Sequence, residues 1–222
     1  ISNSLREQNE KNKADNGVAP LPIYEEGQSL TALKVVPSAG IDPVTGQEIF
    51  IKRDGTYTFV YDSNDKVIFG DTNPFGTGSI NSYLTYKRFA LSCSFLYSFG
   101  GSLYNETLAT KVEGANPKYN ADERVLNDRW KTPGTIAKYK RIDDTTTPYQ
   151  TSRFVEKNNF LRMSSLSLSY EVPTTFIQKY GLKRMFLELL TNDLFYLSTA
   201  KRERGLNYPY DRSFEFSVRF SL

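Results

Sequence analysis

Histidine is absent from this chain of 222 residues, and Cys93 is its only cysteine. A chain with one thiol cannot form an internal disulfide. Zinc sites are normally built from several histidine and cysteine ligands, and Ser-His or Cys-His catalytic pairs need an imidazole as the base. The sequence therefore excludes a zinc site of the usual ligand types and most hydrolase chemistry within this chain.

A large excess of charge of one sign is also missing. Lys and Arg together number 28 and Asp and Glu 25, which gives a net charge of +3. Such a small net charge produces only a weak electrostatic field, which favours neither nucleic acid nor an anionic membrane surface as a partner. No run of about 18 apolar residues occurs, so no transmembrane helix is predicted. In the strands of a transmembrane barrel apolar and polar residues alternate, so these strands score low on hydropathy. A mean hydropathy of -0.49 therefore does not exclude a barrel.

Aromatic residues are plentiful, with 15 Phe and 15 Tyr, and this composition is typical of β-rich proteins. From Phe214 to Leu222 apolar and polar residues alternate without interruption. Successive side chains of a strand point to opposite faces, so this segment predicts a strand with one apolar and one polar face. A soluble sandwich and a membrane barrel both contain such strands, and one strand cannot separate them.

Similar alternation predicts further strands. Residues 80–86 and 89–99 form a predicted hairpin with a tight turn at Lys87-Arg88. Residues 166–171 and 182–197 follow as strands, and an earlier strand is expected from Gly27 to Val36. A small hairpin is expected to turn at Asp54-Gly55. Short and long connections alternate between the strands, with a medium loop after Leu197, and this order is typical of an up-and-down outer-membrane barrel.

Six stretches, in a fixed order, resemble the SusC/RagA family, the outer-membrane TonB-dependent transporters of Bacteroidota. They are "AGIDPVTGQEIFIKRDG", "FGDTNPFGTGSINSYLTYKRFALSCSFLYSFGGSLYN", "VLNDRWKTPG", "NNFLRMSSLSLSYEVP", "LTNDLF" and "RERGLNYPYDRSFEFSVRFSL". Together they cover nearly everything from Gly27 to Leu222. The last stretch is also similar to the C-terminal signal read by the barrel-assembly machinery.

The resemblance implies an all-β fold, the C-terminal strands of a large antiparallel transmembrane β-barrel with long extracellular loops. Such a barrel has about 22 strands around an internal plug. Residues 1–222 are expected to form the C-terminal segment of the barrel domain, about six strands. The plug domain, the TonB box and the earlier strands are expected to lie outside this chain.

The resemblance also implies a function, TonB-dependent import of an oligosaccharide, or less often a peptide, across the cell outer membrane, where the protein would be multi-pass. The implied partners are a SusD-like surface lipoprotein, TonB, the rest of the barrel and plug, outer-membrane lipid and the substrate. Neither an enzymatic step nor a cofactor is expected. The alternative is a soluble β-rich glycan-binding or adhesin module, in which the apolar stripes would touch a protein core.

Candidate residues follow from the faces of the predicted strands. The side chains expected to face lipid are Phe95, Tyr97, Leu168, Phe216 and Val218. Those expected to face a polar lumen are Ser94, Ser167, Glu188, Glu215, Ser217 and Arg219. Trp130, near Tyr119, Tyr139 and Tyr149 in sequence, is a candidate for stacking on a sugar, with packing between loops as the other interpretation. No catalytic, cofactor-binding or metal-binding residue is predicted.

Overall fold

The computed structural model describes residues 3–116, 118–119, 121–201, 203 and 212–222. The chain divides into two compact units, each made of two stretches. The first unit comprises residues 1–74 and 101–157, and the second comprises residues 75–100 and 158–222. Within the described ranges, no helix combines the length and apolar character needed to cross a membrane.

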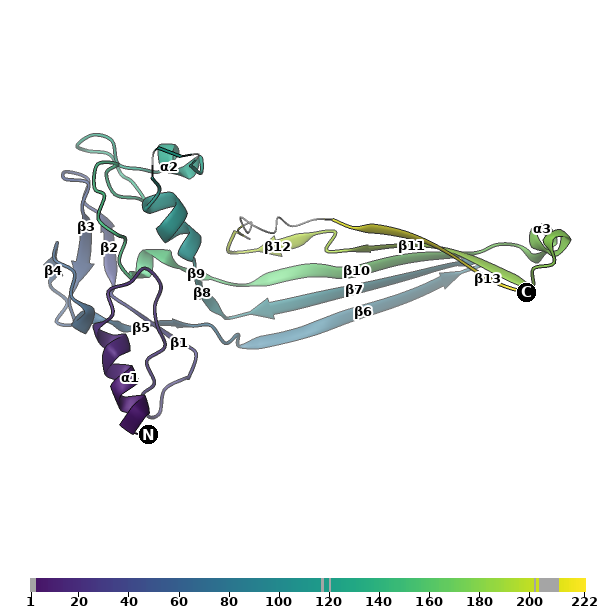
Figure 1. Ribbon diagram of the computed structural model, residues 1–222, viewed down its shortest axis with the longest axis horizontal. Helices are drawn as coiled ribbons and strands as arrows, with labels where there is room; N and C mark the ends of the chain where they lie inside the picture. Colours follow the sequence, from purple (N-terminus) through teal and green to yellow (C-terminus); the bar gives the residue numbers. More distant parts are fainter. Residues whose placement is uncertain (1–2, 117, 120, 202, 204–211) are drawn as a thin grey trace. The chain divides into compact units, whose positions relative to one another are not determined.

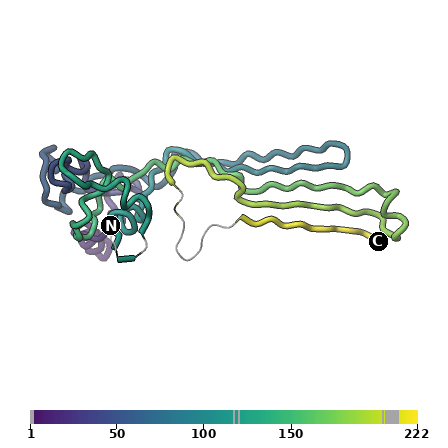
Figure 2. Tube along the Cα trace, turned by 90° about the horizontal axis from the view of Figure 1, so that it is seen from above, coloured from purple at the N-terminus to yellow at the C-terminus, as the bar shows by residue number. Residues whose placement is uncertain are grey.

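An antiparallel sheet, called the long sheet below, makes up most of the second unit (Figures 1 and 2). In spatial order its strands are β13 (Phe214–Ser221), β11 (Arg184–Asn192), β10 (Phe160–Glu171), β7 (Phe89–Phe99) and β6 (Gly76–Tyr86), and β12 (Tyr196–Ser198) also pairs with β10. Figure 2 shows the long strands running side by side. The sequence alternation therefore predicted the strands of this sheet, with differences in their bounds.

The connections within the second unit agree only in part with the sequence prediction. The β6–β7 hairpin turns at Lys87, whose φ is 54°, as expected. The predicted short link after Val172 holds two helical turns, α3 (Thr174–Ile177) and η4 (Gln178–Tyr180). The strand predicted from 182 to 197 is interrupted at Asp193, whose φ is 50°, so that β11 and β12 pair separately with β10. Most of the predicted loop after Leu197 lies outside the described residues.

The register of the long sheet gives it one continuous apolar face. Residues directly opposite each other in an antiparallel pair project to the same face. One such row crosses β13, β11, β10, β7 and β6, and it consists of Phe216, Leu189, Leu168, Leu91 and Leu84. Phe216, Val218 and Leu168 are 65%, 43% and 41% exposed. The described residues of the second unit form no other sheet, so nothing within this unit packs over the apolar face as the second sheet of a sandwich would.

Two glycines of β6 make room for aromatic rings on the same face. Gly76 lies opposite Phe99 and Gly78 opposite Tyr97. A Cβ at Gly76 would be 2.7 Å from Phe99 Cζ, and one at Gly78 would be 2.5 Å from the Tyr97 hydroxyl. Each ring therefore covers the backbone of its partner strand, an arrangement that fixes the pairing register of strands containing glycine.

The first unit is a mixture of short strands and short helical segments. Its elements are α1 (Asn3–Ala14), β1 (Ala32–Val35), β2 (Ser38–Ile41), β3 (Glu48–Ile51), β4 (Tyr57–Thr58), η1 (Ser63–Asp65), β5 (Val67–Asp71), β8 (Ser102–Tyr104), η2 (Leu108–Glu113), α2 (Arg124–Asn127), η3 (Ser152–Phe154) and β9 (Val155–Lys157). The strands pair as β1–β5, β2–β3–β4 and β8–β9. The β3–β4 hairpin turns at Asp54-Gly55, as predicted.

The strand expected from Gly27 to Val36 differs from the prediction. Only Ala32–Val35 is a strand, and it pairs with β5 in the first unit instead of joining the long sheet. Its burial does not alternate, because Lys34 and Val35 are both buried. The residues before it form a turn, in which Gln28 N donates to the Glu25 carbonyl at 3.2 Å. The short apolar run therefore predicted a strand in this region, but the predicted length and the predicted partner strand were wrong.

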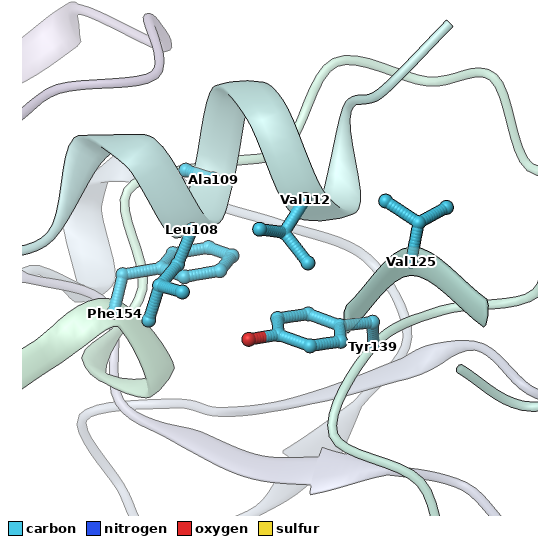
Figure 3. Close-up of a cluster of buried hydrophobic side chains, with 6 residues drawn as sticks. All are labelled: Leu108, Ala109, Val112, Val125, Tyr139 and Phe154. Carbon is cyan, nitrogen blue, oxygen red and sulfur yellow. The ribbon is translucent and has the colours of Figure 1, made fainter. Parts of the chain in front are cut away.

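The first unit has a hydrophobic core centred on η2, which is a π-helix (Figure 3). The core residues are Leu108, Ala109, Val112, Val125, Tyr139 and Phe154. Figure 3 shows the rings of Phe154 and Tyr139 beneath the helix, with Leu108 and Val112 pointing down toward them. Burial raises the pKa of the Tyr139 hydroxyl to about 12. The core joins segments that are distant in the sequence and so closes the first unit.

A buried ion cluster adds a second connection within the first unit. The Arg153 guanidinium donates to both oxygens of Glu48 at 2.7 Å and to both oxygens of Glu113 at 2.8 Å. The side chains of all three residues are at most 10% exposed. Burial alone would lower the pKa of Arg153, but hydrogen bonds and charge from the two carboxylates outweigh it and raise that pKa. The cluster links β3, η2 and η3.

Helix α1 is held by polar contacts, because its sequence has almost no apolar residue. The Asn9 amide exchanges two hydrogen bonds with the backbone of Tyr24, at 2.6 and 3.1 Å. The Lys66 ammonium donates to the carbonyls of Asn12, Lys13 and Asp15 at the end of the helix. A cation there satisfies carbonyls that have no partner inside the helix and complements the helix dipole.

Candidate functional site

The second face of the long sheet is polar and holds the three charged residues predicted to face a lumen. Ser217, Glu188 and Ser169 lie directly opposite one another across β13, β11 and β10. The Ser167 hydroxyl donates to one Glu188 oxygen at 2.8 Å, and Arg219 donates to the other at 2.9 Å. Since Glu215 lies two residues before Ser217 on β13, it shares this face. Glu188, Glu215 and Arg219 are therefore neighbours on one surface.

Small hydroxyl groups make up much of the rest of this polar face. Ser94 and Ser92 of β7 lie opposite Ser165 and Ser167 of β10. The Ser94 hydroxyl also donates to the Asn81 side chain on β6 at 2.5 Å. Apolar residues are present as well, since Leu190 lies opposite Glu215. The face presents hydroxyl and charged groups, in contrast to the continuous apolar face on the other side of the sheet.

Trp130, the candidate stacking residue, lies in the first unit and packs against the turn from Asp42 to Gly46. Its indole Nε1 donates to the Pro43 carbonyl at 2.8 Å. The Gly134 N–H donates to the same carbonyl, also at 2.8 Å. Gly46 has a φ of +73°, and a Cβ there would be 2.6 Å from the Trp130 ring. The predicted packing between loops is therefore present, and it joins "DPVTG" to "RWKTPG".

Arg129, the neighbour of Trp130, is buried and holds the end of η2. Its guanidinium donates to the carbonyls of Val112 and Glu113 at 2.7 Å each, and to those of Lys140 and Arg141 at 3.3 and 3.4 Å. Its Nε–H is buried with no partner in the described chain. Burial lowers the pKa of this guanidinium. Arg129 thus positions the loop that carries Trp130.

A cavity of about 560 Å³ lies beside the Trp130 ring and is called the Trp130 pocket. Val125, Leu126, Arg129, Trp130, Arg141 and Ile142 line it, together with Lys131 and Asp143. Arg141 lies over the indole ring at 6.0 Å and binds the Asp143 carboxylate. The sequence pointed to Trp130 alone. The other lining residues come from α2, from the residues that follow it and from residues 141–143, and no local sequence pattern shows that these segments meet.

Two of the three tyrosines near Trp130 in sequence have rings that are engaged elsewhere, although the backbone N–H of Trp130 donates to the Tyr139 carbonyl at 3.1 Å. Tyr139 is 5% exposed in the core, and Tyr149 stacks on Tyr61 with ring centroids 4.2 Å apart. Tyr119 is 75% exposed. The expectation of several aromatic rings at one site is therefore wrong for Tyr139 and Tyr149, because burial and stacking already occupy both rings.

A second cavity of about 560 Å³ lies between α1 and η1, and most of its charge is already paired. The buried Lys34 ammonium is 2.8 Å from the Glu25 carboxylate, and the three carbonyl contacts of Lys66 occupy its ammonium. In the described part of the chain, no group of three or more His, Cys, Asp or Glu residues is placed to hold a metal ion. The Trp130 pocket and the polar face are the stronger candidates.

Comparison with known proteins identifies similar chains. No family model matches the sequence. The chain is 32% identical to TonB-dependent receptor P3 of Formosa agariphila over 154 residues, which are 68% of this chain and 14% of the receptor. Solved structures of the RagAB peptide importer match with TM-scores of 0.69 in the open-open state and 0.66 in the closed-closed state, at 20% and 21% identity. These matches cover 85% and 84% of this chain and 22% of the importer chain, so the fold is shared with part of a much longer protein.

Proposed function

Because the chain belongs to the SusC/RagA family of TonB-dependent receptors, we propose that it forms the C-terminal part of an outer-membrane β-barrel that imports an oligosaccharide or a peptide. The observation that carries this proposal is the long sheet, with one continuous apolar face and one polar face. The chain spans 14% of the length of the curated relative, so in this proposal transport is an activity of a longer protein that contains this chain.

The strand lengths support a membrane location for the long sheet. β6 and β7 have 11 residues each, β10 has 12, β11 has 9 and β13 has 8. A tilted strand crosses the hydrocarbon core of a bilayer with about 9–11 residues. In this proposal the apolar face contacts lipid, and the polar face with Glu188, Glu215 and Arg219 lines the lumen, where it contacts the plug or the substrate.

The edges of the long sheet explain why the rest of the barrel is a required partner. Within the described chain, β6 and β13 each pair with one strand only. Lipid cannot satisfy the free backbone N–H and C=O groups of an open strand edge. We therefore assign the other side of each edge strand to strands of the same barrel outside this chain. The plug and the TonB-contacting region also belong to those other parts.

The first unit then belongs to the loops of the transporter, where the Trp130 pocket would meet the substrate. A SusD-like surface lipoprotein is the proposed partner on the extracellular side. Import in this mechanism moves the substrate without making or breaking a covalent bond, so no residue has a catalytic role. The binding groups are the pocket in the first unit and the polar wall in the second.

Uptake by intact cells tests the proposal. The gene for the full-length protein is disrupted, and uptake of labelled oligosaccharides and peptides is compared with that of the parent strain and of a strain without TonB. We expect the two defective strains to lose uptake of the same compounds, with the protein recovered in the outer-membrane fraction. Unchanged uptake together with recovery in the soluble fraction would favour the glycan-binding or adhesin module instead.

A further inference from the structure

The Trp130 pocket has mainly apolar walls. Val125 is 3% exposed, whereas Leu126 and Ile142 are 68% and 47% exposed and the Trp130 ring lies beside them. Large apolar side chains normally lose much of their contact with water on folding, and an exposed group of them around a cavity marks a binding surface. A cavity of about 560 Å³ is within the usual range for small-molecule sites.

The polar groups around this pocket are largely engaged with the protein itself. The Trp130 Nε1 is bound to the Pro43 carbonyl, and the terminal nitrogens of Arg129 are bound to four backbone carbonyls. The Asp143 carboxylate is bound by Arg141. A sugar presents several hydroxyls that each need a partner once they leave water. The pocket offers few free partners, so its chemistry is poorly suited to a neutral oligosaccharide.

The charges around the pocket are predominantly positive. Three cations, Arg129, Lys131 and Arg141, line it, and Asp143 is the one carboxylate among its described lining residues. Asp143 already neutralises Arg141, and the buried Arg129 guanidinium interacts with the nearby carboxylates of Glu113 and Asp144, which leaves Lys131 as the lining cation for which the described chain shows no carboxylate partner. An anionic group next to an apolar group would complement both features, because low-dielectric walls strengthen its attraction to these cations.

We infer that the Trp130 pocket binds an apolar or aromatic group that carries a nearby carboxylate, as the C-terminal residue of a peptide does. The apolar part lies against Leu126, Ile142 and the Trp130 ring, and the carboxylate lies toward Lys131. This inference deepens the proposed import function and rests on it, because it selects a peptide over an oligosaccharide as the molecule bound.

Three small probes separate the two features in the purified full-length protein. N-acetyl-phenylalanine has the aromatic group and the carboxylate, N-acetyl-phenylalaninamide has only the aromatic group, and glucuronic acid has only the carboxylate on a sugar. Ligand-observed NMR titration suits such small ligands, whose dissociation constants are expected to be on the order of 1 mM. We expect the acid to bind about tenfold more tightly than the amide, and glucuronic acid not to bind.

Two variants locate the binding. Leu126→Asp places a negative charge on the apolar wall and should weaken binding of N-acetyl-phenylalanine at least about tenfold. Leu30→Asp is the matched control, because Leu30 is 73% exposed in the same unit and does not line the pocket. It should bind the acid as the parent protein does.

The outcomes distinguish this inference from the proposed import function. Equal affinity for acid and amide would overturn the role of the cations, and binding of glucuronic acid in preference to N-acetyl-phenylalanine would assign the pocket to a saccharide. Absence of binding by all three probes, or equal loss in both variants, would overturn the pocket assignment. None of these results depends on uptake. Import can therefore be confirmed while the pocket assignment is wrong, and the pocket assignment can be confirmed while import is wrong.

Discussion

The ring of Trp130 lies so close to Gly46 that a Cβ added to Gly46 would be 2.6 Å from ring atom Cδ2. The two residues are far apart in the sequence, yet they join the turn from Asp42 to Gly46 to the loop that carries the Trp130 pocket. Gly46 is needed there for two reasons, a left-handed φ of +73° and the absence of a side chain. The pocket therefore depends on a backbone position outside it.

The first prediction concerns this contact. Gly46→Ala should destabilise the first unit by about 2–5 kcal/mol, since it combines a strained left-handed residue with overlap against a ring. Gly55→Ala is the control, because Gly55 has a similar φ of +83° with nothing within 4 Å of an added Cβ, and it should cost only about 1–2 kcal/mol. Native-state proteolysis of the full-length protein measures both. Equal protease sensitivity would show that the ring can move away.

The second prediction concerns the buried ion cluster. Arg153→Met leaves Glu48 and Glu113 as two buried carboxylates without a cation, and this should destabilise the first unit by about 3–5 kcal/mol. Lys138→Met removes an ammonium that is 75% exposed and 3.4 Å from Asp128, and it should change stability by no more than about 1 kcal/mol. The rates of native-state proteolysis within the first unit measure the change in stability that each variant causes. A mild effect of Arg153→Met would mean that water reaches the two carboxylates.

The third prediction concerns the pair of Glu188 and Arg219 on the polar face. Their side chains are 25% and 67% exposed, so solvent screens the ion pair. A double-mutant cycle with Glu188→Gln and Arg219→Gln should give a coupling energy below about 1 kcal/mol. Urea unfolding of the full-length protein in detergent provides the four free energies. A coupling above about 2 kcal/mol would indicate that the polar face is dry, which contradicts an aqueous lumen.

The long sheet could be predicted from sequence because alternation with a period of two is a local signal. The strands around Phe95, Leu168 and Phe216, and the turn at Lys87, agree with that pattern. The alternation also assigns residues to the two faces of the sheet, except at the register shift between Met163 and Ser165, where the alternation is interrupted.

The first unit could not be predicted in the same way, because contacts distant in the sequence hold it together. Arg153 binds Glu48 across 105 residues, and Trp130 binds the Pro43 carbonyl across 87. No spacing in the sequence indicates such pairs. Helix α1 was missed because polar side chains and Lys66 hold it, so it lacks the apolar stripe by which a surface helix is recognised. The resemblance identified the motifs of this unit without showing that they contact each other.

The central claim is that the apolar face of the long sheet contacts lipid and the polar face does not. Phe216 and Ser217 are adjacent on β13 and project to opposite faces. The amount of heat-modifiable barrel in the outer membrane, measured for Phe216→Arg and Ser217→Arg in the full-length protein, tests the claim most directly. An arginine in lipid near the bilayer midplane costs about 2–4 kcal/mol, so Phe216→Arg should deplete the assembled barrel while Ser217→Arg leaves it nearly unchanged. Equal assembly of the two variants, or greater loss with Ser217→Arg, would contradict the account.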